Sequence, residues 1–286
     1  MIPKRMYFYW GGSNLSWMRY MTLYSFRKMN PDWEIVLCLS KINEKWSLLR
    51  KQDFLDYKGP DYFNKISELN ITIEDVQFPD DFKNKFKNVS PIHESDLYRY
   101  YKLYDEGGFY SDMDILYFRS MDSIYDEIIS RGSNTILYQC PSYVAIGFLG
   151  AAKDNAFYRD LMLSILNTHI PDCYQSYGVE LIYKFFGIKG NYLLTNDKIE
   201  RKYNELRVYV IPKALVYQYD CYNIDYAFNN ALNINNFDSK AIGYHWYAGS
   251  DIAQRFNNLL NEDNYIGYKT TFSEIAREVL QNGGCI

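Results

Sequence analysis

Two aspartates, Asp112 and Asp114, stand two residues apart between the apolar runs Gly-Gly-Phe-Tyr and Ile-Leu-Tyr-Phe. In an extended segment, side chains two residues apart face the same way with Cα atoms roughly 6.6 Å apart, so both carboxylates can bind one ion. At about 4 Å the two charges would repel by about 4 kcal/mol at an effective dielectric constant of roughly 20, and a cation removes that repulsion. Hard oxygen ligands suit Mn²⁺ or Mg²⁺. Two exposed aspartates in a turn are the alternative, but the apolar flanks and the preceding Gly pair favour a metal site.

A second pair of charged residues, Asp96 and Arg99, precedes the aspartates on a predicted helix. Residues three apart lie on one face of a helix, whereas Leu97, Tyr101 and Tyr104 form its apolar stripe. An ion pair of this kind on a helix surface usually adds little stability. Because this helix leads directly into the two aspartates, we expect its charged face to lie at the same site.

Strands and helices alternate along the chain, and Gly or Pro residues separate many of them. We predict strands at 2–10, 33–39, 71–78, 135–139, 144–149 and 208–211, and a pair of strands across 109–118. We predict helices at 15–28, 44–55, 92–105, 155–167 and 178–186, two more beginning at Ile252 and Thr271, and a solvated charged excursion at 79–87. A strand, a helix and a second strand within the first forty or so residues are typical of an α/β sheet with parallel strands.

The composition is that of a folded protein with a modest charge. The chain has 286 residues, of which 48% are hydrophobic and 23% charged, and its formal net charge is −4. This length suits one large domain or two modest ones, and the composition argues against disorder of the whole chain. Because the sequence has no internal repeat and no low-complexity linker, we expect one compact domain. The slightly negative net charge gives no excess of basic residues with which to bind nucleic acid. The 30 tyrosines suit sugar binding, but the abundance of Asn, Ile and Lys favours biased base composition of the gene for most of them.

No segment of the sequence predicts a membrane anchor. The longest apolar stretch, 143–152, is far shorter than the roughly 20 residues that cross a bilayer. The N-terminal residues lack the apolar region and the cleavage site of a signal peptide. The five cysteines are widely spaced and fit neither a zinc site nor a disulfide framework. We therefore expect a cytoplasmic protein without a transmembrane segment, of bacterial or viral origin, that acts in the cytosol or on the target of a secreted effector.

A gapless signature lies between Ser95 and Asp114. The run Ser-Asp-Leu-Tyr-Arg-Tyr-Tyr-Lys-Leu-Tyr-Asp-Glu-Gly-Gly-Phe-Tyr-Ser-Asp-Met-Asp resembles S-D-x-x-R-Y-x-x-L-Y-x-x-G-G-x-Y-x-D-x-D of the DXD-motif glycosyltransferases. These include family 32, of the initiating mannosyltransferase type, and the catalytic domain of large clostridial toxins. The opening Ile-Pro-Lys-Arg-Met-Tyr-Phe-Tyr-Trp-Gly-Gly is similar to that group's first strand, with Tyr7 where the family often has His. Residues 245–250 resemble its H-x-W-x-G-S-W closure, with Asp251 in place of the final Trp.

The resemblance implies a GT-A fold, a single Rossmann-like α/β domain over residues 1–286 with a mixed central sheet and C-terminal helices. Residues 1–120 would form the nucleotide-binding part with the DXD motif, and residues 121–286 the acceptor-binding and closure part. The implied activity is that of a retaining hexosyltransferase. It would move a sugar from a UDP- or GDP-linked donor to a hydroxyl of a glycan or protein, as in glycan biosynthesis. Mn²⁺ or Mg²⁺ would be its cofactor.

The resemblance also implies roles for single residues. Asp114 would bind the metal directly, Asp112 would assist through water or ribose, and His245 would be the third ligand or a neighbour of the diphosphate. From the residues alone, a histidine between Tyr244 and Trp246 fits a packed, hydrogen-bonded residue equally well. Arg99 would join the two aspartates in the catalytic set. The donor would contact Tyr9, Trp10 and Gly11 at the base, Asp96 and Arg99 at the ribose and sugar, Tyr110 in the pocket wall, Asp112, and Trp246 and Ser250 at the phosphates.

Two departures from the family pattern bear on the mechanism. Ile146 stands where relatives usually have Asn before Gly-Phe, so that polar group is absent or supplied elsewhere. No residue stands out as a nucleophile. Glu180 lies in a segment loosely similar to the family's G-P-x-x-x-T stretch, with Val179 in place of Pro, and a surface glutamate is the better interpretation. Of the remaining histidines, His93 fits a capping or packing residue and His169 a loop.

Two other classes of protein stay open. A metal-dependent phosphohydrolase or nuclease also uses D-x-D, but the sequence has no H-E-x-x-H, no H-x-D and no D-x-D just after the first strand. A non-catalytic carbohydrate-binding protein, or a degenerate transferase acting as a scaffold, would exploit the tyrosines. The presence of both aspartates together with Asp96 and Arg99 argues against degeneration.

Overall fold

The computed structural model describes residues 1–12, 14–41, 57–83, 89–139, 144–167, 175–186, 194–195, 198–199 and 205–281. The helix predicted at 44–55 and the loop predicted around His169 lie outside the described residues.

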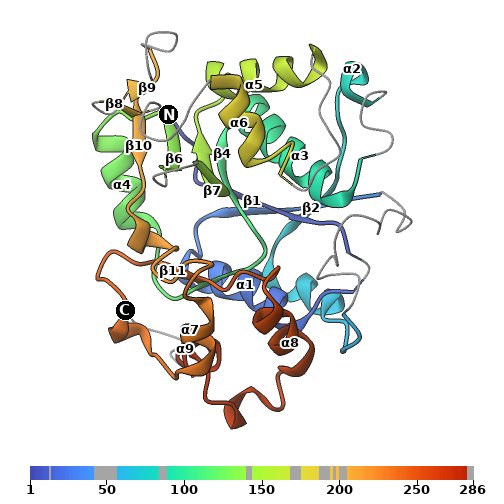
Figure 1. Cartoon of the computed structure of the whole chain (residues 1–286), viewed down its shortest axis with the longest axis vertical. Helices are drawn as coiled ribbons and strands as arrows, with labels where there is room; N and C mark the ends of the chain where they lie inside the picture. The colour runs from blue at the N-terminus through green and yellow to red at the C-terminus, as the bar shows by residue number, and fades with distance from the viewer. Residues whose placement is uncertain are drawn as a thin grey trace.

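A seven-stranded sheet forms the centre of the molecule (Figure 1). Its strands are β1 (Arg5–Trp10), β2 (Glu34–Leu39), β3 (Thr72–Asp75), β4 (Gly108–Ser111), β6 (Thr135–Gln139), β7 (Val144–Ala151) and β10 (Val208–Val210). They follow the order β10–β6–β7–β4–β1–β2–β3. All neighbouring pairs are parallel except those of β7, which runs antiparallel to both β4 and β6. The predicted α/β architecture with a mixed central sheet is therefore confirmed.

The two strands predicted across 109–118 are present, but they do not pair with each other. After β4, the strand β5 (Ile115–Tyr117) pairs antiparallel with β11 (Gly243–His245) in a second sheet. β4 has no free edge for β5, because β1 and β7 occupy both of its edges. The two aspartates consequently lie where the chain passes from one sheet to the other. A third small sheet joins β8 (Leu194–Thr195) and β9 (Lys198–Ile199).

The predicted helices within the described residues are present close to their expected bounds. The α-helices are α1 (Trp17–Met29), α2 (Asp80–Lys83), α3 (Pro91–Asp105), α4 (Asp122–Ser130), α5 (Ala156–Asn167), α6 (Val179–Phe186), α7 (Ile224–Asn229), α8 (Asp251–Leu259) and α9 (Thr271–Gln281). Short 3₁₀ helices span Phe63–Leu69, Lys213–Leu215, Ile234–Asn236 and Tyr265–Gly267. The helices α4 and α7 were not predicted, and α2 is a single turn inside the predicted charged excursion. None of the described helices is both long and apolar enough to span a bilayer.

The strand β1 is buried on both faces, as is typical of a parallel sheet covered by helices on both sides. Met6, Phe8 and Trp10 pack into the core that contains α1 and the C-terminal helices. Tyr7 and Tyr9 pack into the core that contains α3, α5 and α6. Figure 1 shows these two groups of helices on opposite sides of the central sheet. The end of β1 therefore lies between α1 and α3.

The helix α3, which carries Asp96 and Arg99, has clear boundary signals. The Ser90 side chain accepts a hydrogen bond from the His93 N–H at 3.2 Å, and Pro91 occupies the first helical position. After the helix ends, Gly107 and Gly108 have φ angles of 72° and 120°, a region that glycine enters without strain. The glycine pair turns the chain directly from α3 into β4.

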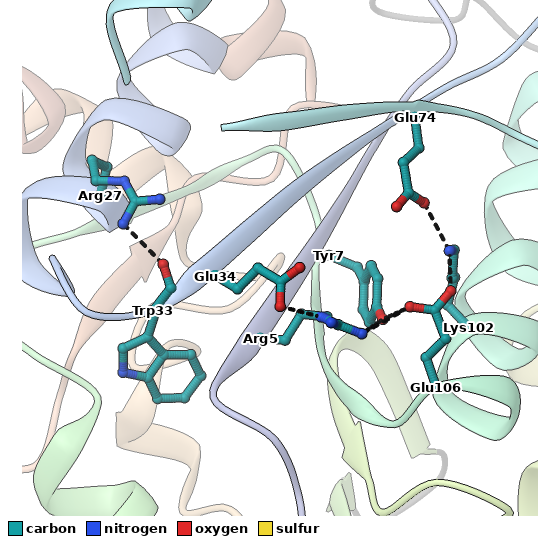
Figure 2. A network of polar contacts seen from close by, with 8 residues as sticks. All are labelled: Arg5, Tyr7, Arg27, Trp33, Glu34, Glu74, Lys102 and Glu106. Carbon is teal, nitrogen blue, oxygen red and sulfur yellow. Dashed lines mark hydrogen bonds and ion pairs between the residues drawn. The ribbon is translucent and has the colours of Figure 1, made fainter. Parts of the chain in front are cut away.

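A polar network anchors the last turn of α3 to the sheet (Figure 2). Lys102 contacts both Glu106 and Glu74 of β3, the latter at 2.8 Å. Glu106 accepts hydrogen bonds from Tyr7 at 2.6 Å and from Arg5 at 2.9 Å, both on β1. These contacts fix the position of α3 relative to β1 and thereby the position of the residues further along its charged face.

We expect Gly108→Ala to lower the free energy of unfolding by about 1–3 kcal/mol. Its Cβ would lie 2.9 Å from the Arg5 carbonyl oxygen, in a backbone conformation that L-residues avoid. Urea denaturation measures this change. Gly267→Ala is the matched control, because a Cβ there meets nothing within 4 Å, and it should change stability by less than about 0.5 kcal/mol. Equal stability of the two variants would contradict the prediction.

Candidate metal and donor site

The two aspartates occupy the turn between β4 and β5. The Asp112 N–H donates to the Gly147 carbonyl of β7 at 2.8 Å, which keeps this residue beside the central sheet. The side chain of Asp114 accepts a hydrogen bond from the Ala248 N–H at 2.8 Å. The backbone carbonyl of Asp114 accepts a second one from the Trp246 N–H at 2.9 Å. The chain that follows β11 therefore holds Asp114 in place.

The strand β11 delivers His245 to the same turn. Because β11 pairs antiparallel with β5, His245 lies opposite Ile115, the residue after Asp114. Its Nε2 lies 3.2 Å from Asp114 Oδ1. One ligand atom from each of Asp112, Asp114 and His245 lies within 4.8 Å of the other two. The structure thus brings together the three residues that were predicted to bind a metal.

These three groups alter one another's charge states. Burial alone would raise the pKa of Asp114, but the neighbouring His245 outweighs burial and the pKa lies far below its usual range. Burial raises the pKa of Asp112, while Arg99 opposes this effect and Asp114 adds to it. Burial would lower the pKa of His245, but the adjacent aspartates raise it above its usual value. Of the two aspartates in the D-x-D pair, Asp112 is therefore the one whose negative charge is less fully balanced by its neighbours.

Among the described residues, the buried His245 Nδ1 makes no hydrogen bond. The buried Asp114 Oδ1 makes no well-aligned hydrogen bond either, and its partner is the ion-pair contact with His245 Nε2 at 3.2 Å. Buried polar atoms without partners are rare in folded proteins and call for an explanation, such as an ion. Two carboxylates and an imidazole are donors that a divalent cation accepts. The residues present therefore fit the metal that the D-x-D pattern predicts.

Arg99 lies buried between two acidic groups. Its guanidinium is 3.0 Å from Asp96 Oδ1 and 3.1 Å from Asp112 Oδ1. It also donates to the Ile146 carbonyl at 2.7 Å and lies 4.4 Å from the ring centre of Tyr110. Burial raises the pKa of Asp96 to about 7, although the charge of Arg99 opposes that effect. The predicted ion pair between Asp96 and Arg99 is therefore buried, and Arg99 also contacts Asp112 of the D-x-D pair.

The residues predicted to contact the base lie between the first turns of α1 and α3. The Tyr9 hydroxyl donates to the buried Glu94 carboxylate at 2.7 Å. Trp10 is buried, with the Arg19 guanidinium 5.0 Å from its ring centre. Gly11 lies so close to its neighbours that a Cβ would be 2.8 Å from Cβ of Pro91. Their contact with a base stays a prediction.

The residues predicted to approach the phosphates have other contacts in this structure. Trp246 is 0% exposed, and its ring meets Phe272 edge-on at 6.0 Å and the Arg19 guanidinium at 5.5 Å. The Ser250 hydroxyl caps α8 by accepting a hydrogen bond from the Ala253 N–H at 3.3 Å. Their roles toward phosphate stay predictions.

The remaining candidate residues have plain structural explanations. The Ile146 carbonyl supplies Arg99 with a polar partner at the position where relatives usually carry Asn. Glu180 is exposed on α6, in agreement with its interpretation as a surface residue. His93 is buried, with its ring 4.8 Å from that of Tyr177, so it packs as expected.

Two further residues at the site were not predicted from the sequence. Arg19 lies between the rings of Trp10 and Trp246, and its charge contributes to lowering the pKa of Asp114. Tyr217 lies beside His245, and burial together with the charge of Asp112 raises its pKa well above the usual value. Neither residue stands in a recognisable motif, and Tyr217 is one of 30 tyrosines. Only the folded structure distinguishes them.

The chain is thus an α/β protein with a mixed sheet. Its candidate site is a D-x-D acid pair that follows a strand of this sheet and faces a histidine. Residues 16–131 match the family model described as "Glycosyltransferase sugar-binding region containing DXD motif". The matched segment is about two fifths of the length of the chain. The predicted resemblance to the DXD-motif glycosyltransferases is thereby confirmed for these residues.

Solved structures of glycosyltransferases are distantly similar to this chain. The PaToxG glycosyltransferase is 16% identical over 65% of this chain and 69% of its own, with a TM-score of 0.44. The galactosyltransferase LgtC, solved with donor and acceptor sugar analogs, is 13% identical over 91% of this chain and 98% of its own, with a TM-score of 0.43. GlyE of Streptococcus pneumoniae is 11% identical over 98% of this chain and 64% of its own, with a TM-score of 0.47. No curated protein gives a significant sequence match.

We expect Arg99→Ala to lower the free energy of unfolding by about 3–5 kcal/mol, because it leaves Asp96 buried without its cation. Arg159→Ala is the control, since Arg159 pairs with Asp160 at 3.0 Å while about half exposed, and its loss should cost less than about 1 kcal/mol. Urea denaturation compares the two variants. Similar small losses in both would show that the contacts of Arg99 add no stability.

Gly147→Ala should disturb the acid pair with little effect on the rest of the fold. A Cβ at this position would lie 2.6 Å from Asp112 Oδ2 and would push that carboxylate away. We expect Mn²⁺ binding, followed by electron paramagnetic resonance of the free ion, to weaken by at least about tenfold. Gly150→Ala on the same strand would instead press on Phe109 at 2.9 Å, so it should lower stability and spare Mn²⁺ binding. Equal Mn²⁺ affinity in the two variants would contradict the placement of Asp112.

Proposed function

We propose that the protein is a metal-dependent glycosyltransferase that moves a hexose from a UDP- or GDP-linked donor to a hydroxyl group of a glycan or protein. The observation that carries the proposal is the cluster of Asp112, Asp114 and His245, whose ligand atoms lie within 4.8 Å of one another. The acid pair belongs to the region that matches the sugar-binding family model. We further propose Mn²⁺ or Mg²⁺ as the cation, because the two carboxylates supply hard oxygen ligands.

The reaction breaks the bond between the anomeric carbon and the diphosphate, so negative charge builds on the departing oxygen. A bound divalent cation supplies positive charge that stabilises such a leaving group. The protein's own residues prepare this environment. His245 and the Ala248 N–H orient Asp114, and Arg99 orients Asp112. Arg19 adds a second buried positive charge near the two aspartates.

The resemblance to family 32 and to the toxin domains supports retention of the anomeric configuration. Retention requires attack from the face of the departing group or a covalent intermediate. Glu180 is a poor nucleophile candidate, because its side chain is exposed on α6. We therefore propose front-face attack by the acceptor hydroxyl, with residues 1–120 binding most of the nucleotide and residues 121–286 providing closure and acceptor contacts.

Thermal shift with Mn²⁺ and UDP or GDP tests this proposal against its alternatives. A ligand present at 100 times its dissociation constant stabilises the folded state by about 2.7 kcal/mol. A glycosyltransferase should respond to the nucleotide only with metal present, and it should slowly hydrolyse one member of a panel of nucleotide-sugars. A carbohydrate-binding protein should respond to free sugar without metal. A phosphohydrolase should instead release inorganic phosphate from the nucleotide.

We expect Asp114→Asn to abolish metal-dependent nucleotide binding and sugar transfer, because it removes the charge while the amide oxygen still accepts from the Ala248 N–H. Asn is preferable to Ala here, since Ala would also remove that hydrogen bond. Calorimetric titration of nucleotide in the presence of Mn²⁺ measures the loss. Glu180→Gln removes an exposed carboxylate and should leave binding and turnover unchanged. Wild-type turnover in Asp114→Asn would refute the assigned role, and inactive Glu180→Gln would reopen the question of a nucleophile.

A further inference from the structure

Tyr217 occupies a fixed position beside the acid pair. The Val216 carbonyl accepts a hydrogen bond from the His245 N–H at 3.0 Å, and the Tyr217 N–H donates to the Lys213 carbonyl at 2.9 Å. The ring stacks on Tyr138 at 4.7 Å with an interplanar angle of 16°, and its centre lies 5.4 Å from that of His245. Backbone and ring contacts therefore leave the side chain little freedom to turn away.

The hydroxyl of Tyr217 points at the same place as Asp112. A Cβ built on Gly147 would lie 3.1 Å from the Tyr217 hydroxyl and 2.6 Å from Asp112 Oδ2, so both atoms flank this glycine. The hydroxyl is buried, and no residue described in the structure forms a hydrogen bond with it. A buried hydroxyl without a partner destabilises the folded protein. Its position next to the acid pair suggests that a ligand supplies the partner.

The chemistry of the site identifies that ligand. The carboxylates of Asp112 and Asp114 offer acceptors only, and these are the atoms that a cation takes. A phenol hydroxyl has a proton to donate, and a neighbouring anionic oxygen is its strongest acceptor. Building on the proposed function, we propose that the Tyr217 hydroxyl donates a hydrogen bond to a diphosphate oxygen of the nucleotide-sugar donor. Tyr217 would thus be a donor-binding residue of the site.

Tyr244 offers a matched control on the adjacent strand. It precedes His245 on β11 and therefore faces the opposite side of the strand. Its ring packs against Phe237 at 5.9 Å and Tyr219 at 6.5 Å. Its hydroxyl is also buried and forms no hydrogen bond with the described residues. Tyr217 and Tyr244 thus share burial and the lack of a partner, and they differ in whether they face the acid pair.

The experiment compares the full-length wild type with Tyr217→Phe and Tyr244→Phe. We would measure the melting temperature without ligand, the affinity for Mn²⁺ alone, and the affinities for UDP and GDP with Mn²⁺ saturating. Neither substitution should lower the melting temperature, because each removes a hydroxyl that forms no hydrogen bond with the residues that the structure describes. Tyr217→Phe should weaken binding of the nucleoside diphosphate that the wild type prefers by about tenfold to a hundredfold, with Mn²⁺ affinity unchanged. Tyr244→Phe should bind both ligands as the wild type does.

Three results would overturn the proposal. Nucleoside diphosphate affinity of Tyr217→Phe equal to that of the wild type would remove Tyr217 from the donor site while leaving the proposed function standing. Weaker binding of Mn²⁺ alone, to the same extent as the nucleotide, would make Tyr217 a part of the ion site instead. A wild type that binds neither UDP nor GDP with Mn²⁺ would overturn the proposed function itself.

Discussion

The placement of three carboxylates in one part of the molecule is the constraint on which the candidate site depends, because those of Asp96 and Asp114 are buried and that of Asp112 is only 30% exposed. An isolated charge in a protein interior is strongly unfavourable unless it is paired and hydrogen-bonded. Arg99 lies 3.0 Å from Asp96 and 3.1 Å from Asp112, and His245 lies 3.2 Å from Asp114. One arginine thus serves two acids, and the raised pKa of Asp112 shows that this compensation is incomplete. A divalent cation would complete it, which is why the arrangement favours ion binding over a purely structural network.

Segments that are far apart in the sequence bring positively charged groups to these carboxylates, around the turn between β4 and β5. The helix α3 brings Arg99 from one side of the sheet, and α1 brings Arg19 from the other. Between them, the chain leaves β4 and enters a second sheet, so that β11 can run beside β5 and present His245. Tyr217 arrives on a segment that is hydrogen-bonded to β11. The break between the two sheets, which the sequence did not reveal, is therefore what brings these side chains together.

Sequence reasoning reached the parts of the site that are local in the chain. The cap at Ser90-Pro91, the glycine pair at 107–108 and the D-x-D spacing all act within about twenty residues, and they predict α3 and the acid turn. His245 was reached only through the resemblance, because its contact with Asp114 depends on the pairing of β5 with β11. Trp246 shows the opposite problem, since a motif position suggests ligand contact while the side chain is 0% exposed. Arg19 and Tyr217 depend on tertiary packing alone, which no local pattern encodes.

A missing hydrogen bond does not identify a site by itself. Tyr158 and Tyr244 also have buried hydroxyls that form no hydrogen bond with the described residues. Neither tyrosine belongs to the cluster of Asp112, Asp114 and His245 that could bind a cation. At the acid turn, by contrast, a carboxylate oxygen of Asp114 whose one close partner is His245, a ring nitrogen of His245 without a hydrogen bond among the described residues, and the hydroxyl of Tyr217 occur around one cluster. Acceptors and a donor placed together in this way match a ligand that itself combines a cation with an anion. A metal–diphosphate pair has that composition, and its binding would give these groups the partners that they lack among the described residues.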